Sequence, residues 1–153
     1  MTSRRKPTDG APLADAKTVR AMMAGACDLA VAVDAEGVVR LVETGGEDFA
    51  GARPEEWVGR PLEAFVTPES VPKLRALLEE ARTAERPRRR ELNHPSGAGE
   101  DLPIRYSAAY APEDDLVLLM GRDMRAIASL QARLVAAQQA MEQEYERLRQ
   151  MET

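Results

Sequence analysis

The chain has 153 residues, of which 44% are hydrophobic, and it carries a formal net charge of −5. This length and composition allow one domain with a mainly aliphatic core, and the acidic balance gives no overall attraction to nucleic acid or anionic membranes. No apolar run approaches the roughly 20 residues that a membrane-spanning helix needs, and no signal peptide is recognisable. A single cysteine excludes an intramolecular disulfide, so a reducing, cytoplasmic location is expected.

The amino-terminal part of the chain changes from a polar arm to regular structure. Residues 1–14 are polar and interrupted by Pro and Gly, which predicts a disordered arm. From Asp15 the sequence predicts a short helix that ends near Gly25. Two runs rich in Val and Leu follow, and the Gly-containing turn at residues 34–37 joins them into a predicted β-hairpin over residues 29–42.

The rest of the compact part combines helices with three further strands. Short helical turns are predicted after Pro54, and a longer helix is predicted between Pro68 and Glu85. Three strands are predicted from the runs RRRELNH, DLPIRYSAAY and DLVLLMGRD, which the turn formers PSGAGE and APEDD separate. The order of elements predicts an α+β domain over residues 15–121, with a five-stranded, antiparallel sheet and helices on one face.

The last segment, residues 122–153, predicts one long helix. From Asp123 onward it contains no Gly and no Pro and is rich in residues that favour helices. Its apolar residues recur at heptad spacing, interrupted only by Glu144, which predicts a coiled-coil seam for a partner helix. The seam consists of Ile127, Leu130, Leu134, Ala137, Met141, Leu148 and Met151. The alternative is a terminal helix that folds back on its own domain.

Three residues, Gly121, Arg122 and Asp123, join the last predicted strand to this helix. The Asp123 carboxylate is placed to accept free backbone N–H groups at the helix start. A shift of the sheet would therefore change the angle or register of the helix. The flanking charges fix neither helix orientation nor oligomer number, so a homodimer is the default expectation and a tetramer is the alternative.

Candidate catalytic and cofactor-binding residues are few. The sequence has no Gly-rich phosphate loop, nucleophile elbow or H-E-x-x-H motif, so we expect no catalytic residues. Cys27 lies before the first predicted strand, where a buried, inert thiol is expected. His94 is expected to be a turn histidine that is hydrogen-bonded to nearby backbone, in preference to a haem ligand. One histidine and one cysteine cannot supply a usual metal site, so neither a metal nor a cofactor is expected.

The run of Arg86, Arg88, Arg89 and Arg90 is the strongest basic feature of the sequence. Because no aromatic residues are interleaved with it, a charged edge strand that discourages sheet-to-sheet association is the simpler interpretation. Contact with a DNA backbone is the alternative.

Several segments resemble one family of bacterial regulators. They are AEGVVRLV, WVGRPLEAFVTPESVPKLR, ELNH, LPIRY and LMGRDMRAIASLQARLVAAQQAMEQEYERLRQMET. Together they resemble the amino-terminal part of PpsR/CrtJ-type regulators, which are repressors of photosynthesis genes in purple bacteria. The resemblance covers residues 19–153. Its most specific part begins at Gly121 and is similar to the glutamine-rich linker helix of that family.

The resemblance implies an amino-terminal PAS-like domain, this linker, two further PAS domains and a carboxy-terminal helix-turn-helix that binds DNA. It also implies repression of bacteriochlorophyll and carotenoid synthesis genes under oxygen, countered in some members by a flavin-containing antirepressor protein. This segment would then hold protomers together and relay a signal. Because the chain ends within the heptad repeat without a helix cap, we expect it to be a fragment of a longer protein.

The alternative function is a ligand-sensing PAS domain of another signal-transduction protein, such as a sensor kinase. In that case the ligand would occupy the interior beneath the segment from Trp57 to Val66.

Overall fold

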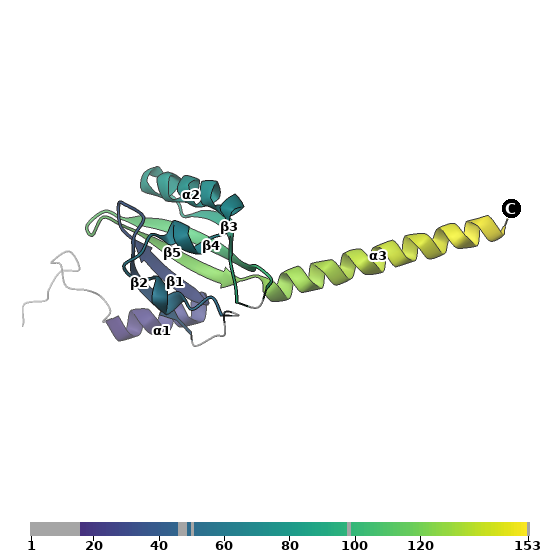
Figure 1. Ribbon diagram of the computed structural model, residues 1–153, viewed down its shortest axis with the longest axis horizontal. Coiled ribbons are helices and arrows are strands. Elements are labelled where there is room, and N and C mark those ends of the chain that lie inside the picture. Colours follow the sequence, from purple (N-terminus) through teal and green to yellow (C-terminus); the bar gives the residue numbers. More distant parts are fainter. Residues whose placement is uncertain (1–15, 46–48, 50, 98, 153) are drawn as a thin grey trace, which may run out of the picture.

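The computed structural model describes residues 16–45, 49, 51–97 and 99–152, so the expected arm at residues 1–14 and the expected helix start at Asp15 lie outside it. In chain order, the elements are α1 (Ala16–Ala26), β1 (Leu29–Val33), β2 (Val39–Thr44), three 3-10 turns (Pro54–Trp57, Leu62–Phe65 and Pro68–Ser70), α2 (Val71–Thr83), β3 (Arg88–His94), β4 (Leu102–Ala111), β5 (Leu116–Asp123) and α3 (Arg125–Met151). The predicted α+β fold with a five-stranded antiparallel sheet and a long final helix is confirmed (Figure 1).

The sheet brings the two ends of the domain together. Its strand order is β2-β1-β5-β4-β3, and all neighbouring strands are antiparallel. β5 therefore lies between β1 and β4, and its residue Gly121 is opposite both Leu29 and Tyr106. As a result, the end of β5, where α3 begins, lies beside the start of β1.

The predicted hairpin between β1 and β2 forms because its turn residues suit the geometry. Asp34 Oδ1 accepts the backbone N–H groups of Glu36 and Val38 at 2.9 and 3.0 Å. Gly37 has a φ of +81°, a left-handed conformation that glycine adopts without a steric penalty. The side chain of Asp34 also pairs with Arg40 at 2.6 Å, which fixes the hairpin further.

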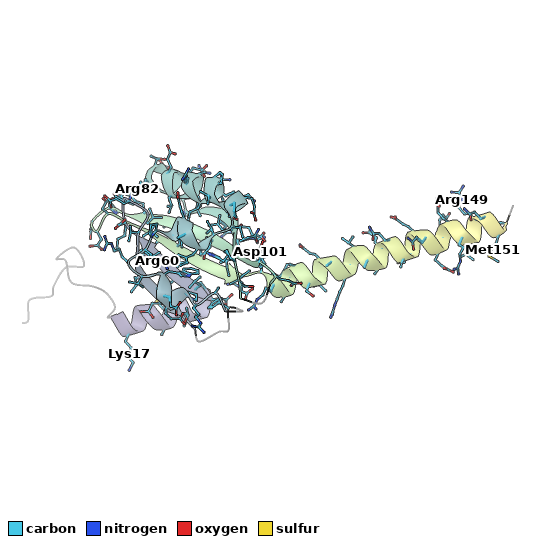
Figure 2. The ribbon with its side chains drawn as sticks, viewed as in Figure 1. Lys17, Arg60, Arg82, Asp101, Arg149 and Met151 are labelled. Atoms are coloured by element: carbon cyan, nitrogen blue, oxygen red, sulfur yellow. The ribbon has the colours of Figure 1, made fainter. Side chains whose placement is uncertain are left out.

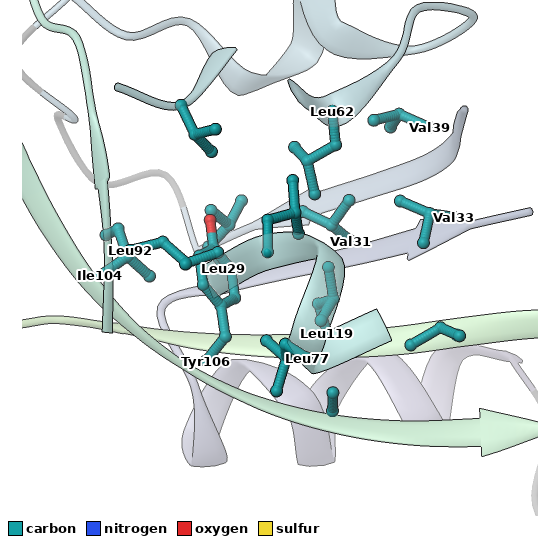
Figure 3. Close-up of a cluster of buried hydrophobic side chains, with 14 of the residues drawn as sticks. Leu29, Val31, Val33, Val39, Leu62, Leu77, Leu92, Ile104, Tyr106 and Leu119 are labelled. Carbon is teal, nitrogen blue, oxygen red and sulfur yellow. The ribbon is translucent and has the colours of Figure 1, made fainter. Parts of the chain in front are cut away.

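One face of the sheet carries the core, as the strand alternation predicts. In β4, the buried side chains are those of Leu102, Ile104, Tyr106 and Ala108, and their neighbours in sequence are more exposed. Figure 3 shows Ile104 and Tyr106 of this strand in one cluster with Leu29 of β1 and Leu119 of β5. α2 contributes Leu74, Leu77 and Ala81, and the 3-10 turns contribute Trp57 and Leu62. We call the face of the sheet that carries this core the inner face.

The opposite, outer face of the sheet is less covered. α1 lies beside it at the start of β1, where Ala21 and Met23 line a hollow together with Ala30 and Glu43. Most described side chains of α1 are exposed, and Met22 retains 68% of its accessible surface. α1 is therefore held to the domain by its connection to β1 and by the few residues that line this hollow.

α3 extends away from the domain as a single rod (Figure 1). Its 27 residues give it a length of about 40 Å at about 1.5 Å per residue. Every residue from Arg125 to Met151 is exposed. The alternative expectation, a terminal helix folded back on its own domain, is wrong for this structure, because no α3 side chain is buried against the sheet or the other helices.

Candidate functional site

The junction between β5 and α3 is tightly packed at Gly121. A Cβ atom at this position would lie 2.7 Å from Cγ2 of Ile104 and 2.8 Å from Cε1 of Tyr106. These distances are shorter than carbon atoms tolerate, so only glycine fits without movement of the Tyr106 ring. The backbone carbonyl of Gly121 also accepts the N–H of Asp28 at 2.8 Å. The end of β5 is thus fixed against both β4 and the start of β1.

Arg122 and Asp123 connect the junction to α1 and β1. Arg122 Nη2 donates to the carbonyl oxygen of Ala26 at 2.8 Å, which places a cation at the carboxy-terminal end of α1. The backbone N–H of Asp123 donates to Oδ2 of Asp28 at 2.8 Å. The start of β1 and the root of α3 are therefore joined through residues that are far apart in sequence.

The beginning of α3 is defined by Asp123 and Met124. Asp123 Oδ1 accepts the backbone N–H of Arg125, the first residue of α3, at 2.9 Å, and Oδ2 pairs with the Arg125 guanidinium at 2.7 Å. Met124 is buried, with 4% of its surface exposed, and its N–H donates to the Pro103 carbonyl at 2.9 Å. The helix therefore leaves the domain from a buried, hydrogen-bonded root, although its body is exposed.

The structure places all seven seam residues of α3 on exposed surface. Leu134 retains 61% and Met141 retains 73% of its accessible surface. In Figure 2, Met151 and Arg149 at the far end of α3 point away from the rod into open space. This leaves an apolar stripe along a helix of which no residue is buried.

The heptad pattern of the sequence does not include Tyr145. Its side chain is 65% exposed and lies at helical spacing from Met141 and Leu148, in an i, i+4, i+7 stripe. Glu144, which interrupts the heptad series, instead pairs with Arg147 at 3.1 Å. The 3.6-residue period of an α-helix places Tyr145 on the same side as Met141 and Leu148, so this period would have added Tyr145 to the predicted stripe.

His94 lies in the core, which corrects the expectation of a turn histidine. It ends β3 as predicted, but it is fully buried, and its hydrogen-bond partner is the carbonyl oxygen of Phe65, far away in sequence. Nδ1 donates to that carbonyl at 2.7 Å, and Nε2 accepts the Tyr106 hydroxyl at 2.6 Å. The Trp57 ring stacks on the imidazole at a centroid distance of 4.8 Å.

This arrangement keeps His94 neutral. Burial lowers the pKa of His94 to about 4, and the hydrogen bond to Phe65 raises it only in part. Burial likewise raises the pKa of Tyr106 far above its ordinary value, so the phenol keeps its proton. Both imidazole nitrogens are used by protein groups, so His94 has no free nitrogen for an axial bond to haem.

The other candidate residues have structural environments. The Cys27 thiol is half-buried and donates weakly to the Met23 carbonyl at 3.3 Å, and burial followed by the charge of Asp28 raises its pKa. Such a thiol is a poor nucleophile. β3 is an edge strand, as expected, and its arginines are divided between the two faces, because Arg90 pairs with Glu80 of α2 at 2.9 Å.

The described part of the chain holds neither a metal-binding cluster nor a membrane-spanning helix. Among the described residues, no group of three or more His, Cys, Asp or Glu side chains is arranged to hold a metal ion. Within the same ranges, no helix is both long and apolar enough to cross a membrane.

The strand order, the turns over the inner face and the exit of α3 from β5 define a PAS domain. The PAS fold family matches residues 26–129, so the chain belongs to this family. A domain of a sensory box sensor histidine kinase/response regulator from Geobacter sulfurreducens has a TM-score of 0.54 at 24% identity, over 70% of this chain and 92% of that one. The PAS domain of the RpfR quorum-sensing receptor from Cronobacter turicensis, solved with BDSF, has a TM-score of 0.51 at 14% identity, over 63% and 92%. These two structures establish the fold alone.

Among curated proteins, the chain is similar to the protein CrtJ of Rhodobacter capsulatus. The two are 36% identical over 132 residues, which is 86% of this chain and 28% of CrtJ. The resemblance to PpsR/CrtJ-type regulators, with an amino-terminal PAS domain, is thereby confirmed. The chain spans less than a third of this relative.

Proposed function

We propose that this chain is the amino-terminal oligomerisation and signal-relay module of a PpsR/CrtJ-type repressor of photosynthesis genes, those for bacteriochlorophyll and carotenoid synthesis. It acts in the cytoplasm and catalyses no reaction. DNA is bound by a carboxy-terminal domain outside this segment, and an antirepressor protein is a further partner. The similarity to CrtJ over most of the chain supports this assignment.

The observation that carries the oligomerisation role is the exposed stripe on α3. A helix of 27 residues that leaves all of its apolar side chains exposed is unfavourable in water. Burying one Leu side chain contributes about 1.5–3 kcal/mol. Pairing of α3 with the same helix of a second copy buries the whole seam from Ile127 to Met151 in a coiled coil.

The junction supplies the relay. Gly121 is fixed against Tyr106, and Asp123 is fixed against Asp28, so movement of the sheet is transmitted to the root of α3. The buried Met124 side chain prevents the helix from swinging freely. A change in the sheet therefore alters the crossing angle or register of paired helices, and through them the domains that follow.

The test is a pair of charged substitutions in the seam. Leu130→Asp with Leu134→Asp places carboxylates where two helices would meet, and we expect association to weaken by about a hundredfold or more. Ala132→Asp with Gln139→Asp adds the same charge on the opposite side of α3 and is the matched control. Multi-angle light scattering should give a monomer for the seam variant and the wild-type mass for the control. If the seam variant keeps the wild-type mass, α3 does not join the protomers.

The second candidate function is a ligand-sensing PAS domain, since the Cronobacter turicensis neighbour was solved with a bound small molecule. Here Trp57 stacks between Phe65 and His94, and Tyr106 closes the same region, so aromatic rings occupy the interior beneath the 3-10 turns. Native mass spectrometry and visible absorbance of the purified protein separate the two functions. A stoichiometric bound molecule or pigment would favour the ligand sensor over the relay module.

A further inference from the structure

Three arginines from three neighbouring strands line one hollow on the outer face of the sheet. Arg89 belongs to β3, Arg105 to β4 and Arg122 to β5. The hollow has a volume of about 370 Å³, and the end of α1 closes one side of it. Ser107 and Met120 form part of its floor. We call this site the arginine hollow.

Strand register brings these side chains together. Arg105 of β4 is directly opposite Arg122 of β5. Arg89 of β3 is opposite Ser107, which lies two residues after Arg105 in β4 and therefore on the same face of the sheet. Directly opposite side chains in a sheet have Cβ atoms about 5 Å apart, and like charges there destabilise the sheet. The isolated chain therefore places repulsive cations side by side, and a bound anion would remove that repulsion.

The arginines of the hollow differ from four other arginines of the domain. Arg40, Arg75, Arg82 and Arg90 each pair with a carboxylate at 2.9 Å or less. Within the described residues, the side chains of Arg89 and Arg105 make no hydrogen bond and no ion pair. Arg122 uses one of its five N–H groups on the Ala26 carbonyl and retains the others.

Two carboxylates, those of Glu91 and Asp28, lie next in sequence or register to residues of the hollow, and among the described residues neither forms an ion pair with its arginines. Glu91 is opposite Arg105 on the same face of the sheet, and no ion pair forms between these two described residues. Asp28 follows Cys27 at the end of α1, and its carboxylate is engaged by the backbone N–H of Asp123. The guanidinium groups therefore keep donors for an external acceptor.

We propose that the arginine hollow binds a small phosphorylated molecule through its phosphate group. A phosphate presents terminal oxygens in several directions, which suits guanidinium forks that reach in from three strands, whereas a carboxylate presents two oxygens in one plane. The Ser107 hydroxyl supplies a further donor. The volume exceeds that of a phosphate alone, and Met120 with Ala26 gives the organic part of the ligand an apolar contact.

The position of the hollow connects the ligand to the helix root. Arg122 directly precedes Asp123, and its guanidinium already bonds the end of α1. A phosphate held by Arg105 and Arg122 would tighten β4, β5 and α1 against one another just before α3 begins. This regulatory consequence rests on the proposed relay function, whereas the binding itself does not.

The test is calorimetric titration of the full chain with inorganic pyrophosphate and with ADP at low salt. Arg105→Gln removes a charge-assisted hydrogen bond and should weaken binding of both probes by about tenfold or more. Arg133→Gln, an exposed arginine on α3, is the matched control and should bind like the wild type. Glu91→Gln removes the bordering negative charge and should bind more tightly. Tighter binding of ADP than of pyrophosphate would identify an organic phosphate as the ligand class.

NMR spectra of the wild-type chain locate the binding site without any substitution, so they apply even if a variant fails to fold. In ¹H–¹⁵N NMR spectra, pyrophosphate should shift the backbone amide signals of Arg105, Ser107 and Arg122. Absence of binding at millimolar probe, or equal losses in Arg105→Gln and Arg133→Gln, would overturn the proposal. So would Arg105-dependent binding of duplex DNA without binding of either probe, which would assign the surface to nucleic acid. The outcome of these binding experiments is independent of the outcome of the light-scattering test of α3.

Discussion

Gly121 occupies the point where β5 lies against the Tyr106 ring, and there is no room for a methyl group. We expect Gly121→Ala to lower the free energy of unfolding by about 1–3 kcal/mol, because the added Cβ must displace Ile104 or Tyr106. Urea unfolding measures this change. Gly45→Ala is the control, since a Cβ added at Gly45 would have no atom within 4 Å, and it should change stability by less than about 0.5 kcal/mol. Equal effects of the two substitutions would contradict the tight junction.

His94 gives the stability of the domain a pH dependence of defined sign. Its pKa in the folded chain is about 4, below the ordinary value of 6.5, so the unfolded chain binds the proton more readily between these values. The stabilisation is complete above about pH 6.5 and is lost as the pH falls toward about 4. Through this residue, the free energy of unfolding should drop by about 2 kcal/mol between about pH 7 and about pH 5.

Urea unfolding of wild type and His94→Gln at the two pH values isolates this contribution. The variant should be less stable near neutral pH, because the Tyr106 hydroxyl and the Phe65 carbonyl lose part of their hydrogen bonding. It should lose much less additional stability on acidification than the wild type. A pH slope that is the same in both proteins would show that His94 is not held neutral in the core.

At the scale of the elements, the Asp28 side chain joins the start of β1 to the root of α3. Asp28→Ala removes the acceptor for the Asp123 N–H, which should cost about 1–2 kcal/mol. Amide hydrogen exchange should become faster at Asp123, while amides in the middle of β4 remain protected. Asp114→Ala, an exposed aspartate in the turn between β4 and β5, is the control. Unchanged exchange at Asp123 would mean that Asp28 does not fix the helix root.

Local patterns in the sequence are sufficient to predict the elements themselves. The alternation from Leu102 to Ala108 identifies the buried face of β4, and the Gly-containing turn at residues 34–37 identifies the hairpin. The absence of Gly and Pro after Asp123 identifies α3. Each of these signals lies within one element, where backbone preference and side-chain periodicity act directly.

Contacts between distant elements could not be predicted in the same way. The bond between Asp28 and Asp123, the partner of His94 at Phe65 and the arginine hollow all depend on which strands are neighbours and in which register. The pattern within one element does not specify which strands become its neighbours. The burial of His94 is a different case, because the alternation within β3, with Leu92 buried, already places it on the inner face.

Taken as a whole, the chain is a PAS domain with an exposed helix rooted in its central strand. The apolar interior is closed by the 3-10 turns and α2, so the largest uncovered apolar feature of the described residues is the stripe along α3. In the proposed function, α3 is also the element that carries a rearrangement at Gly121, Arg122 and Asp123 away from the PAS domain. Oligomerisation and signal relay are therefore two consequences of the same helix in the proposed function.

Sedimentation equilibrium of the wild-type chain over a range of concentrations tests the central claim most directly. One chain has a mass of 16.8 kDa, and pairing or bundling through α3 should give twice or four times this value at micromolar concentration. The seam variant with Leu130→Asp and Leu134→Asp should sediment as the single chain. A wild-type mass of one chain at every concentration would contradict the account.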